Sequence, residues 1–239
     1  MTSFHNIHGV ILKKTLYKDS DAILQILTQE QGKMSFYARG IKKAQSKIGA
    51  LLQVGNVIEL EVIQGKGNMA NIKNAKTIFI PEIPHYESLR VFQRSLEITQ
   101  HICQEAHELP HIFHTLSQFI IEFTHTNSEL LSFAYEYKLL KHLGFIGDAK
   151  TCSKCHEPLA ACEHFFLPER GIICNICSSE FPYLSKLPLS IIKILIFFQN
   201  DSFKNIKKLQ ISEEEYKVLQ FFIITLRKQF IHKTLKTEG

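Results

Sequence analysis

The sequence contains no tryptophan, and three motifs that often mark enzymes are also missing. It has no GxxxxGK(S/T) phosphate loop, no GxGxxG dinucleotide fingerprint and no GxSxG nucleophile elbow. Carboxylates that lie close in sequence, such as Glu59 and Glu61, are more simply explained as solubilising groups on a strand. No catalytic constellation remains, so the sequence indicates a binding protein rather than an enzyme.

A long hydrophobic run is likewise missing. The longest apolar stretch, Leu189 to Phe198, is interrupted by Ser190 and Lys193 and falls far short of the roughly 20 residues that cross a bilayer. No secretory signal peptide is expected at the start. With 45% hydrophobic residues and 18 Phe, the chain has the composition of a globular protein. We expect a cytoplasmic protein with no membrane association.

Positive charge is concentrated in the first third of the chain. Residues 1–80 hold 11 Lys and Arg against 5 Asp and Glu, a net of 11 − 5 = +6, whereas residues 81–239 hold 17 against 18, a net of −1. This split suggests that a basic module meets a polyanion while the rest does something else. The alternative is an ordinary solvated basic surface.

The first eighty residues predict five short strands. Val57 to Ile63 alternates strictly between apolar and acidic residues, as a half-buried strand does. Gly65 to Asn68 is expected to be a hairpin turn. Five strands in this length favour a small antiparallel barrel, of which the oligonucleotide/oligosaccharide-binding (OB) fold is the leading candidate, over a domain of residues 1–80. The expected strands are Gly9–Tyr17, Ala22–Thr28, Met34–Ala38, Val57–Ile63 and Asn71–Ile80.

Residues 39–49, here called the basic loop, separate the third and fourth strands. The loop has glycines at both ends of its basic run and no apolar periodicity, so we expect it to be flexible and to follow a phosphate backbone without reading bases. Of Phe36 and Tyr37, which precede it, only one can face outward and stack on a base. The four cations of the basic loop are Arg39, Lys42, Lys43 and Lys47.

The remainder, residues 81–239, predicts an all-helical domain. Apolar residues fall at helical spacing between Leu89 and Cys103 and again between Ile112 and Phe123. A third helix should run from about Ser128 to Leu143, closed by Gly144. Further helices are expected over Leu189–Asn200 and after the capping box Ser212-Glu-Glu-Glu215.

Four cysteines interrupt this helical domain. They form two Cys-x2-Cys pairs separated by eighteen residues, a strong pattern for a closed, structural Zn2+ site that folds a knuckle over residues 151–178. Four reduced thiols or two disulfides are the alternatives. His156, Cys162 and His164 lie between the pairs and compete for a ligand position, whereas Cys103 is expected to be an ordinary thiol. The predicted ligands are Cys152, Cys155, Cys174 and Cys177.

His107-Glu-Leu-Pro-His111 matches the HExxH pattern of zinc proteases. That mechanism needs both imidazoles one turn apart on a continuous helix, and Pro110 falls inside the turn. We therefore expect a run of surface histidines at a helix junction instead of a protease site.

The order of these features resembles the RecO family of bacterial recombination mediators. The likeness covers nearly the whole chain, and the presence of all four cysteines implies a zinc-bearing version, since some members of the family lack them. The segments that carry the likeness are Gly9–Lys13, Asp19–Asp21, Leu27–Lys33, Ala38–Lys43, Ser46–Gly49 and Phe166–Cys174.

The resemblance implies a DNA repair protein that binds single- and double-stranded DNA and anneals complementary strands. It also implies that the protein works with RecR to load RecA on DNA coated by single-strand-binding protein, at the bacterial nucleoid. The barrel and basic loop would touch DNA through Arg39, Lys42, Lys43 and Lys47, with Lys13 and Lys14 as further candidates. The helical domain would receive the C-terminal tail of single-strand-binding protein, with Lys204, Lys207 and Lys208 as candidate rims.

Two other functions remain open from sequence. A zinc-ribbon adaptor would bind protein partners without touching DNA, and the basic first third argues against it. A nuclease would need clustered carboxylates for a hard metal ion, and the sequence has no such cluster.

Overall fold

The computed structural model describes residues 3–64, 69–103, 110–159, 163–231, 235 and 237, with side chains from residue 6 onward. It contains two compact units, one formed by residues 1–127 with 235–239 and the other by residues 128–234. The domain boundary expected near residue 80 stays a prediction. The first compact unit includes two helices that follow the strands. No helix in the described ranges is long and apolar enough to cross a membrane.

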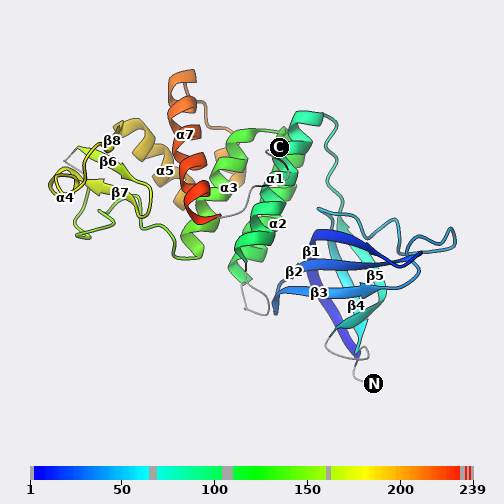
Figure 1. Ribbon diagram of the computed structural model, residues 1–239. Helices are drawn as coiled ribbons and strands as arrows, with labels where there is room; N and C mark the ends of the chain where they lie inside the picture. Colours follow the sequence, from blue (N-terminus) through cyan, green and yellow to red (C-terminus); the bar gives the residue numbers. More distant parts are fainter. Residues whose placement is uncertain are drawn as a thin grey trace. The chain divides into compact units, whose positions relative to one another are not determined.

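Five strands close into a barrel in the first unit (Figure 1). Their order around the barrel is β1-β2-β3-β5-β4, and only the β3–β5 pairing is parallel. The predicted five-stranded barrel of the OB type is therefore confirmed. The strands are β1 (Ser3–Tyr17), β2 (Asp21–Thr28), β3 (Gly32–Ala38), β4 (Val57–Ile63) and β5 (Ala70–Phe79).

Strand β1 is long because it pairs with two strands, β4 and β2. Its first half pairs with β4 and its second half with β2, and register shifts lie between Phe4 and Ile7 and between Ile11 and Lys13. Such bulges bend a strand and increase its twist, which lets one strand turn from one neighbour to the next. At Gly9 a Cβ atom would lie 2.4 Å from the Ile26 side chain, so glycine allows the two strands to approach there.

The barrel interior is filled from alternate strand positions, as the period of two predicts. In β4, Ile58, Leu60 and Val62 are buried, whereas Glu59 and Glu61 on the other face are only half-buried. Two residues of the connection between β3 and β4, Ile41 and Leu52, also belong to this core. The turn predicted over residues 65–68 lies outside the described residues.

Two helices, α1 (Tyr86–Ile102) and α2 (Pro110–Thr126), complete the first unit. Phe92 of α1 stacks on Phe119 and Phe123 of α2, at ring-centroid distances of 6.3 and 5.8 Å. Lys33 of β3 donates to the Gln100 carbonyl at 2.6 Å, which ties the end of α1 to the barrel. His111 is the second residue of α2, so no helical turn of HExxH form precedes it in the described residues, and His107 and Glu108 lie outside them.

Thr237 also contacts α1. The Leu235 side chain is buried, and Thr237 donates to the Glu97 carboxylate through both its amide and its hydroxyl, at 3.3 and 3.1 Å. The Arg90 guanidinium donates to the Thr237 carbonyl at 3.1 Å. These contacts join Thr237 to the first unit.

The second unit combines helices with a small sheet. The predicted helices are present, and α7 begins with the capping box of Ser212 and Glu215. A three-stranded antiparallel sheet in the order β7-β6-β8 was not predicted. The elements are α3 (Glu129–His142), β6 (His164–Leu167), β7 (Gly171–Cys174), α4 (Asn175–Ser178), β8 (Ser185–Leu187), α5 (Leu189–Asn200), α6 (Phe203–Ile206) and α7 (Glu213–Phe230).

A buried ion pair links α3 to α7. The Arg227 guanidinium donates to both carboxylate oxygens of Glu136, at 2.9 and 3.2 Å, and the two side chains are only 4% and 2% exposed. The Ser132 hydroxyl donates to the same carboxylate at 3.4 Å. A bidentate, buried pair of this kind fixes the relative register of the two helices, since neither charge has water to replace its partner.

Candidate metal centre and candidate nucleic-acid interface

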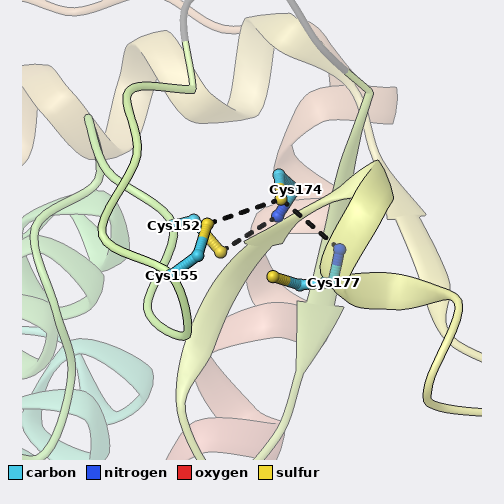
Figure 2. A group of neighbouring side chains, drawn as sticks. All are labelled: Cys152, Cys155, Cys174 and Cys177. Atoms are coloured by element: carbon cyan, nitrogen blue, oxygen red, sulfur yellow. Dashed lines mark hydrogen bonds between the residues drawn. The ribbon is translucent and has the colours of Figure 1, made fainter.

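The four predicted cysteines converge in the second unit. Their sulfur atoms all lie within 4.8 Å of one another (Figure 2). Cys152 and Cys155 come from the turn that precedes β6, Cys174 ends β7, and Cys177 lies in α4. The eighteen intervening residues thus include the β6–β7 hairpin, which returns the second pair to the first.

Backbone amides donate to the sulfur atoms and set their positions. The Cys177 amide donates to the Cys174 sulfur at 3.5 Å, and the Lys154 amide donates to the Cys152 sulfur at 3.5 Å. The Cys174 amide adds a bond to the Cys152 sulfur at 3.4 Å, which joins the two Cys-x2-Cys turns. His156 closes the first turn with a positive φ of 64°. Each turn therefore presents its two sulfurs to one side.

The spacing of the sulfurs fits a tetrahedral metal better than a disulfide. The Cys155 and Cys174 sulfurs are 3.8 Å apart. A tetrahedron with metal–sulfur bonds of about 2.3 Å has edges of about 3.8 Å, whereas a disulfide bond is about 2.05 Å long. All four cysteines are free thiols in the structure. The donor set is therefore suited to a soft or borderline divalent cation such as Zn2+.

The electrostatics of the cluster also call for a cation. Burial opposes ionisation of Cys152, but the amide bonds from Cys155, Cys174 and Lys154 outweigh it and lower the pKa of Cys152 to about 6. Burial and the neighbouring sulfurs raise the pKa of Cys177 to about 12. One thiolate thus forms readily while another resists, chiefly because burial disfavours a charge on Cys177. A bound cation would offset that cost.

The competing ligands are not part of the cluster. His164 is buried and its Nε2 pairs with the Leu159 carbonyl at 2.7 Å, and His156 is exposed. Neither joins the group of metal-ligating atoms found among the described residues. Cys162 lies outside those residues. Cys103 is buried in the first unit, where desolvation raises its pKa to about 12, as for an inert thiol.

All four cations of the basic loop are exposed in the first unit. Arg39, Lys42, Lys43 and Lys47 follow β3 directly and extend over the connection to β4. The loop is expected to be flexible, but Ile41 within it is 6% exposed and belongs to the barrel core. The backbone at Ile41 is therefore held against the barrel, and the four cationic side chains of the loop are exposed.

Asp21 organises the start of the basic loop. Its carboxylate accepts hydrogen bonds from the Tyr37 hydroxyl and from the Gly40 amide, the latter at 2.7 Å. The Tyr37 hydroxyl and then the Gly40 amide hold the pKa of Asp21 below its usual range. The Lys42 amide also donates to the Ser20 carbonyl at 3.1 Å. The turn between β1 and β2 therefore fixes the loop that follows β3.

Local sequence pattern does not assign this role to Asp21, Ile41 or Leu52. Asp21 stands among polar residues, and the two aliphatic residues show no periodicity. The sequence did place the apolar residue Ile41 inside the basic loop. Such a residue indicates a contact with the core but does not identify the residues that it contacts.

Lys13 and Lys14 lie on opposite faces of β1. Lys14 is paired in register with the core residue Leu24, and its ammonium donates to the Leu52 carbonyl at 2.9 Å. Burial lowers its pKa, so Lys14 serves the barrel as a structural donor. Lys13 is paired with Gln25 on the outer face and is half-buried. Of the two, only Lys13 lies on the outer face of the strand.

Comparisons with known proteins agree with this arrangement. The model named "Recombination protein O N terminal" matches residues 1–80, and "Recombination protein O C terminal" matches residues 86–237. The chain belongs to the RecO family of DNA repair proteins. Both models together span the barrel, the helices and the cysteine cluster.

Individual RecO relatives are distant in sequence but similar in extent. A protein named "DNA repair protein RecO" from Dehalococcoides mccartyi is 27% identical over 231 residues, covering 93% of this chain and 90% of the relative. Proteins of the same name from Clostridium perfringens and Bacillus pumilus are each 28% identical, covering 90% and 76% of this chain and 89% and 71% of the relatives. The likeness to RecO noted from the sequence is confirmed.

Proposed function

We propose that this RecO-family protein is a recombination mediator that binds single- and double-stranded DNA and anneals complementary strands. With RecR, it helps RecA to load on DNA coated by single-strand-binding protein. It acts by binding, without catalysing a reaction, in the cytoplasm at the nucleoid. The family membership supports a role in DNA repair. The proposed binding and annealing of DNA rest on the chemistry of the barrel, and the proposed partners rest on the resemblance to the family.

The observation that carries the proposal is the basic loop. Four exposed cations project from a segment that Asp21 and Ile41 hold against the barrel, inside the portion of the chain with a net charge of +6. A fixed backbone with long, mobile cationic side chains can neutralise phosphates without depending on base sequence. Lys13 extends the same positive potential along β1.

Annealing follows from binding alone. Two DNA strands repel through their phosphates, and cations that neutralise both strands reduce that repulsion and release condensed counterions. The activity should therefore weaken steeply as salt concentration rises. Since no chemical bond changes, the protein needs no nucleophile or general base for this step.

The four cysteines would hold one Zn2+ that maintains the fold of the second unit. When bound, the ion supplies four metal–sulfur bonds that join the turn before β6 to the end of β7. Backbone amides of this chain orient the sulfurs. Buried side chains of β6 and β7 exclude water from the site. No open coordination position is expected from a four-cysteine set.

The second unit is the proposed receiver of the C-terminal tail of single-strand-binding protein. Lys204 and Lys208 are exposed at α6, and Lys207 beside them is half-buried. Cations at such a position would complement an acidic peptide. RecR and, indirectly, RecA complete the proposed set of partners.

A protein-interaction adaptor without DNA binding is the second candidate. It is favoured by the surface next to the cysteine cluster, where Ile176 is 77% exposed and Tyr183 is fully exposed. Exposed apolar side chains on a rigid support are common at protein interfaces. In that case the basic loop would be an ordinary solvated surface.

Fluorescence anisotropy with a labelled single-stranded oligonucleotide across a salt series tests the proposal. The variant replaces Arg39, Lys42, Lys43 and Lys47 with alanine. A control variant replaces Lys193, Lys204, Lys208 and Lys217, which are exposed in the second unit and carry the same total charge.

We expect the loop variant to bind weakly on every sequence and to flatten the slope of log K against log salt by about 2 to 3, since each phosphate contact on a single strand contributes about 0.7. The control variant should keep the slope of the natural protein. An unchanged slope in the loop variant would remove the basic loop from the interface. No binding by the natural protein at low salt would favour the adaptor.

A further inference from the structure

Two tyrosines lie side by side on the outer face of the barrel, next to the basic loop. Phe36 is buried in the core, which leaves Tyr37 as the outward residue of that pair. Tyr17, at the end of β1, is 45% exposed. The rings of Tyr17 and Tyr37 meet edge to face, with centroids 5.9 Å apart and planes at 77°. These two residues are called the aromatic pair below.

The strand register explains why the pair forms. Tyr17 is paired with Asp21 and Tyr37 with Ile23, so both tyrosines share the face of β2 that carries Asp21 and Ile23. The alternate face carries the core residues Ala22 and Leu24. Because β2 runs between β1 and β3, the two rings reach toward each other across it.

Asp21 holds the aromatic pair in place, and cations lie beside it. The Tyr37 hydroxyl donates to Asp21, and Asp21 also accepts from the Gly40 amide. The Lys18 ammonium lies 5.4 Å from the centre of the Tyr17 ring, a cation–π distance. Arg39 is close enough to act electrostatically on both Tyr37 and Asp21. The rings thus sit where the turn after β1 meets the basic loop.

Packing gives no reason for the exposure of Tyr17. Its neighbour Leu16 is 54% exposed, so the end of β1 shelters neither side chain. Of the nearby carboxylates, Asp21 is committed to Tyr37 and Gly40, and Asp19 lies in the exposed turn. An apolar ring bordered by Lys18 and Arg39 complements a ligand that is both flat and anionic.

We propose that the aromatic pair is a stacking site for an unpaired base of single-stranded DNA, with the adjoining phosphates on Lys18 and Arg39. The inference rests on the proposed function, and it adds a contact that phosphate binding alone does not provide. Every base has a π-face, so the site accepts any sequence. A duplex keeps its bases stacked and paired, so it cannot use the site, and the protein gains a preference for single strands.

Comparing oligomers with and without bases separates base stacking from phosphate binding. The first probe is a labelled oligothymidylate, the second is an abasic deoxyribose-phosphate oligomer of the same length, and the third is a duplex. The variants are Tyr17→Ala and Tyr17→Phe, with Tyr86→Ala as a control because Tyr86 is 72% exposed on α1.

We expect Tyr17→Ala to bind oligothymidylate about 5- to 100-fold more weakly, the range found when a stacked aromatic is removed. Its affinity for the abasic oligomer and the duplex should not change. Tyr17→Phe keeps a ring and should bind all three probes as the natural protein does, and Tyr86→Ala should match it.

A fluorescence signal gives a second readout. Because the sequence has no tryptophan, Tyr17→Trp places the single indole of the protein at the site. Its emission should be quenched by oligothymidylate and left unchanged by the abasic oligomer at equal saturation. Unequal quenching of this kind is not expected from a purely structural role.

The outcomes distinguish this inference from the function on which it rests. If the natural protein binds the abasic oligomer as tightly as oligothymidylate, the stacking site is refuted while DNA binding stands. If it binds none of the three probes at low salt, the proposed function itself fails. Loss of affinity for all three probes in Tyr17→Ala, with circular dichroism unchanged, would also refute a base-specific contact.

Discussion

The barrel unit and the unit of residues 128–234 differ in how far their cations, cysteines and ion pairs are exposed to solvent. In the barrel unit the cations of the basic loop stand in solvent, above a core of aliphatic side chains. In the other unit three of the four cysteines and the Glu136–Arg227 pair are buried. Charge can therefore be removed from the first surface with little effect on folding, whereas removing it from the second interior leaves uncompensated groups.

Metal removal is expected to produce the largest effect, and only in the second unit. Binding of a structural zinc contributes about 10 kcal/mol or more that is coupled to folding. A strong chelator should release about one zinc per chain and make the segment around residues 151–187 sensitive to protease. Atomic absorption and limited proteolysis measure these two results.

Chelation of the metal should not change the fold of the barrel. DNA binding at low salt should persist after chelation, and Cys103→Ala should retain its zinc, since that thiol lies outside the cluster. A protein that loses no metal to the chelator, or that keeps its full protease resistance without metal, would contradict the assignment of the four cysteines.

Breaking the buried ion pair should be the next largest effect. Arg227→Met leaves the Glu136 carboxylate buried without its partner and should reduce the free energy of unfolding by about 3 to 5 kcal/mol. Urea denaturation of the second unit measures the loss. The double variant Glu136→Met with Arg227→Met should recover most of it, because it removes both charges; equal losses in the single and double variants would argue against this account.

A smaller effect is expected at Asp21, where the first unit does rely on a polar anchor. Since its pKa is lowered in the folded state, its stabilising contribution is present above the ordinary carboxyl pKa and is lost as pH falls below it. Asp21→Asn should thus lower the Tm at neutral pH, and its difference from the natural protein should shrink in acid.

Asp19→Asn is the matched control for this change. It removes the same charge two residues away, in an exposed turn, and should leave the Tm nearly unchanged. Thermal unfolding followed by circular dichroism between neutral and acidic pH compares the three proteins. A Tm difference for Asp21→Asn that does not vary with pH would show that ionisation of this carboxyl does not stabilise the loop.

The smallest effect is expected at the start of α7. The Ser212 hydroxyl accepts from the Glu215 amide at 3.2 Å, and Ser212→Ala should cost about 1 kcal/mol in the free energy of unfolding. Ser202→Ala is a control, because Ser202 precedes α6 without a side-chain capping bond. Equal losses for the two serines in urea denaturation would show that the capping bond contributes nothing.

The sequence was most informative where structure follows from local pattern. Alternation in Val57–Ile63, the glycine at 144 with its positive φ and the capping box at Ser212 each predicted an element that the structure contains. The cysteine cluster was equally accessible, because the spacing of the two pairs already specifies a chemistry.

Features that depend on distant residues were not accessible in this way. The sheet of β6, β7 and β8 consists of very short strands, and β8 pairs with β6 across about twenty residues. Asp21 gains its role only when the pairing of β2 with β3 brings Tyr37 and Gly40 beside it. No sequence pattern singles out Tyr17, because its contact with Tyr37 depends on how β1, β2 and β3 pair.

The contacts of Thr237 with α1 have a consequence for synthesis of the chain. The ribosome makes α1 long before these residues, and the whole of residues 128–234 is translated in between. During that time the Glu97 carboxylate and the Arg90 guanidinium lack their Thr237 partner. The barrel can form early, but the hydrogen bonds of α1 with Thr237 form only after residues 128–234 have been made.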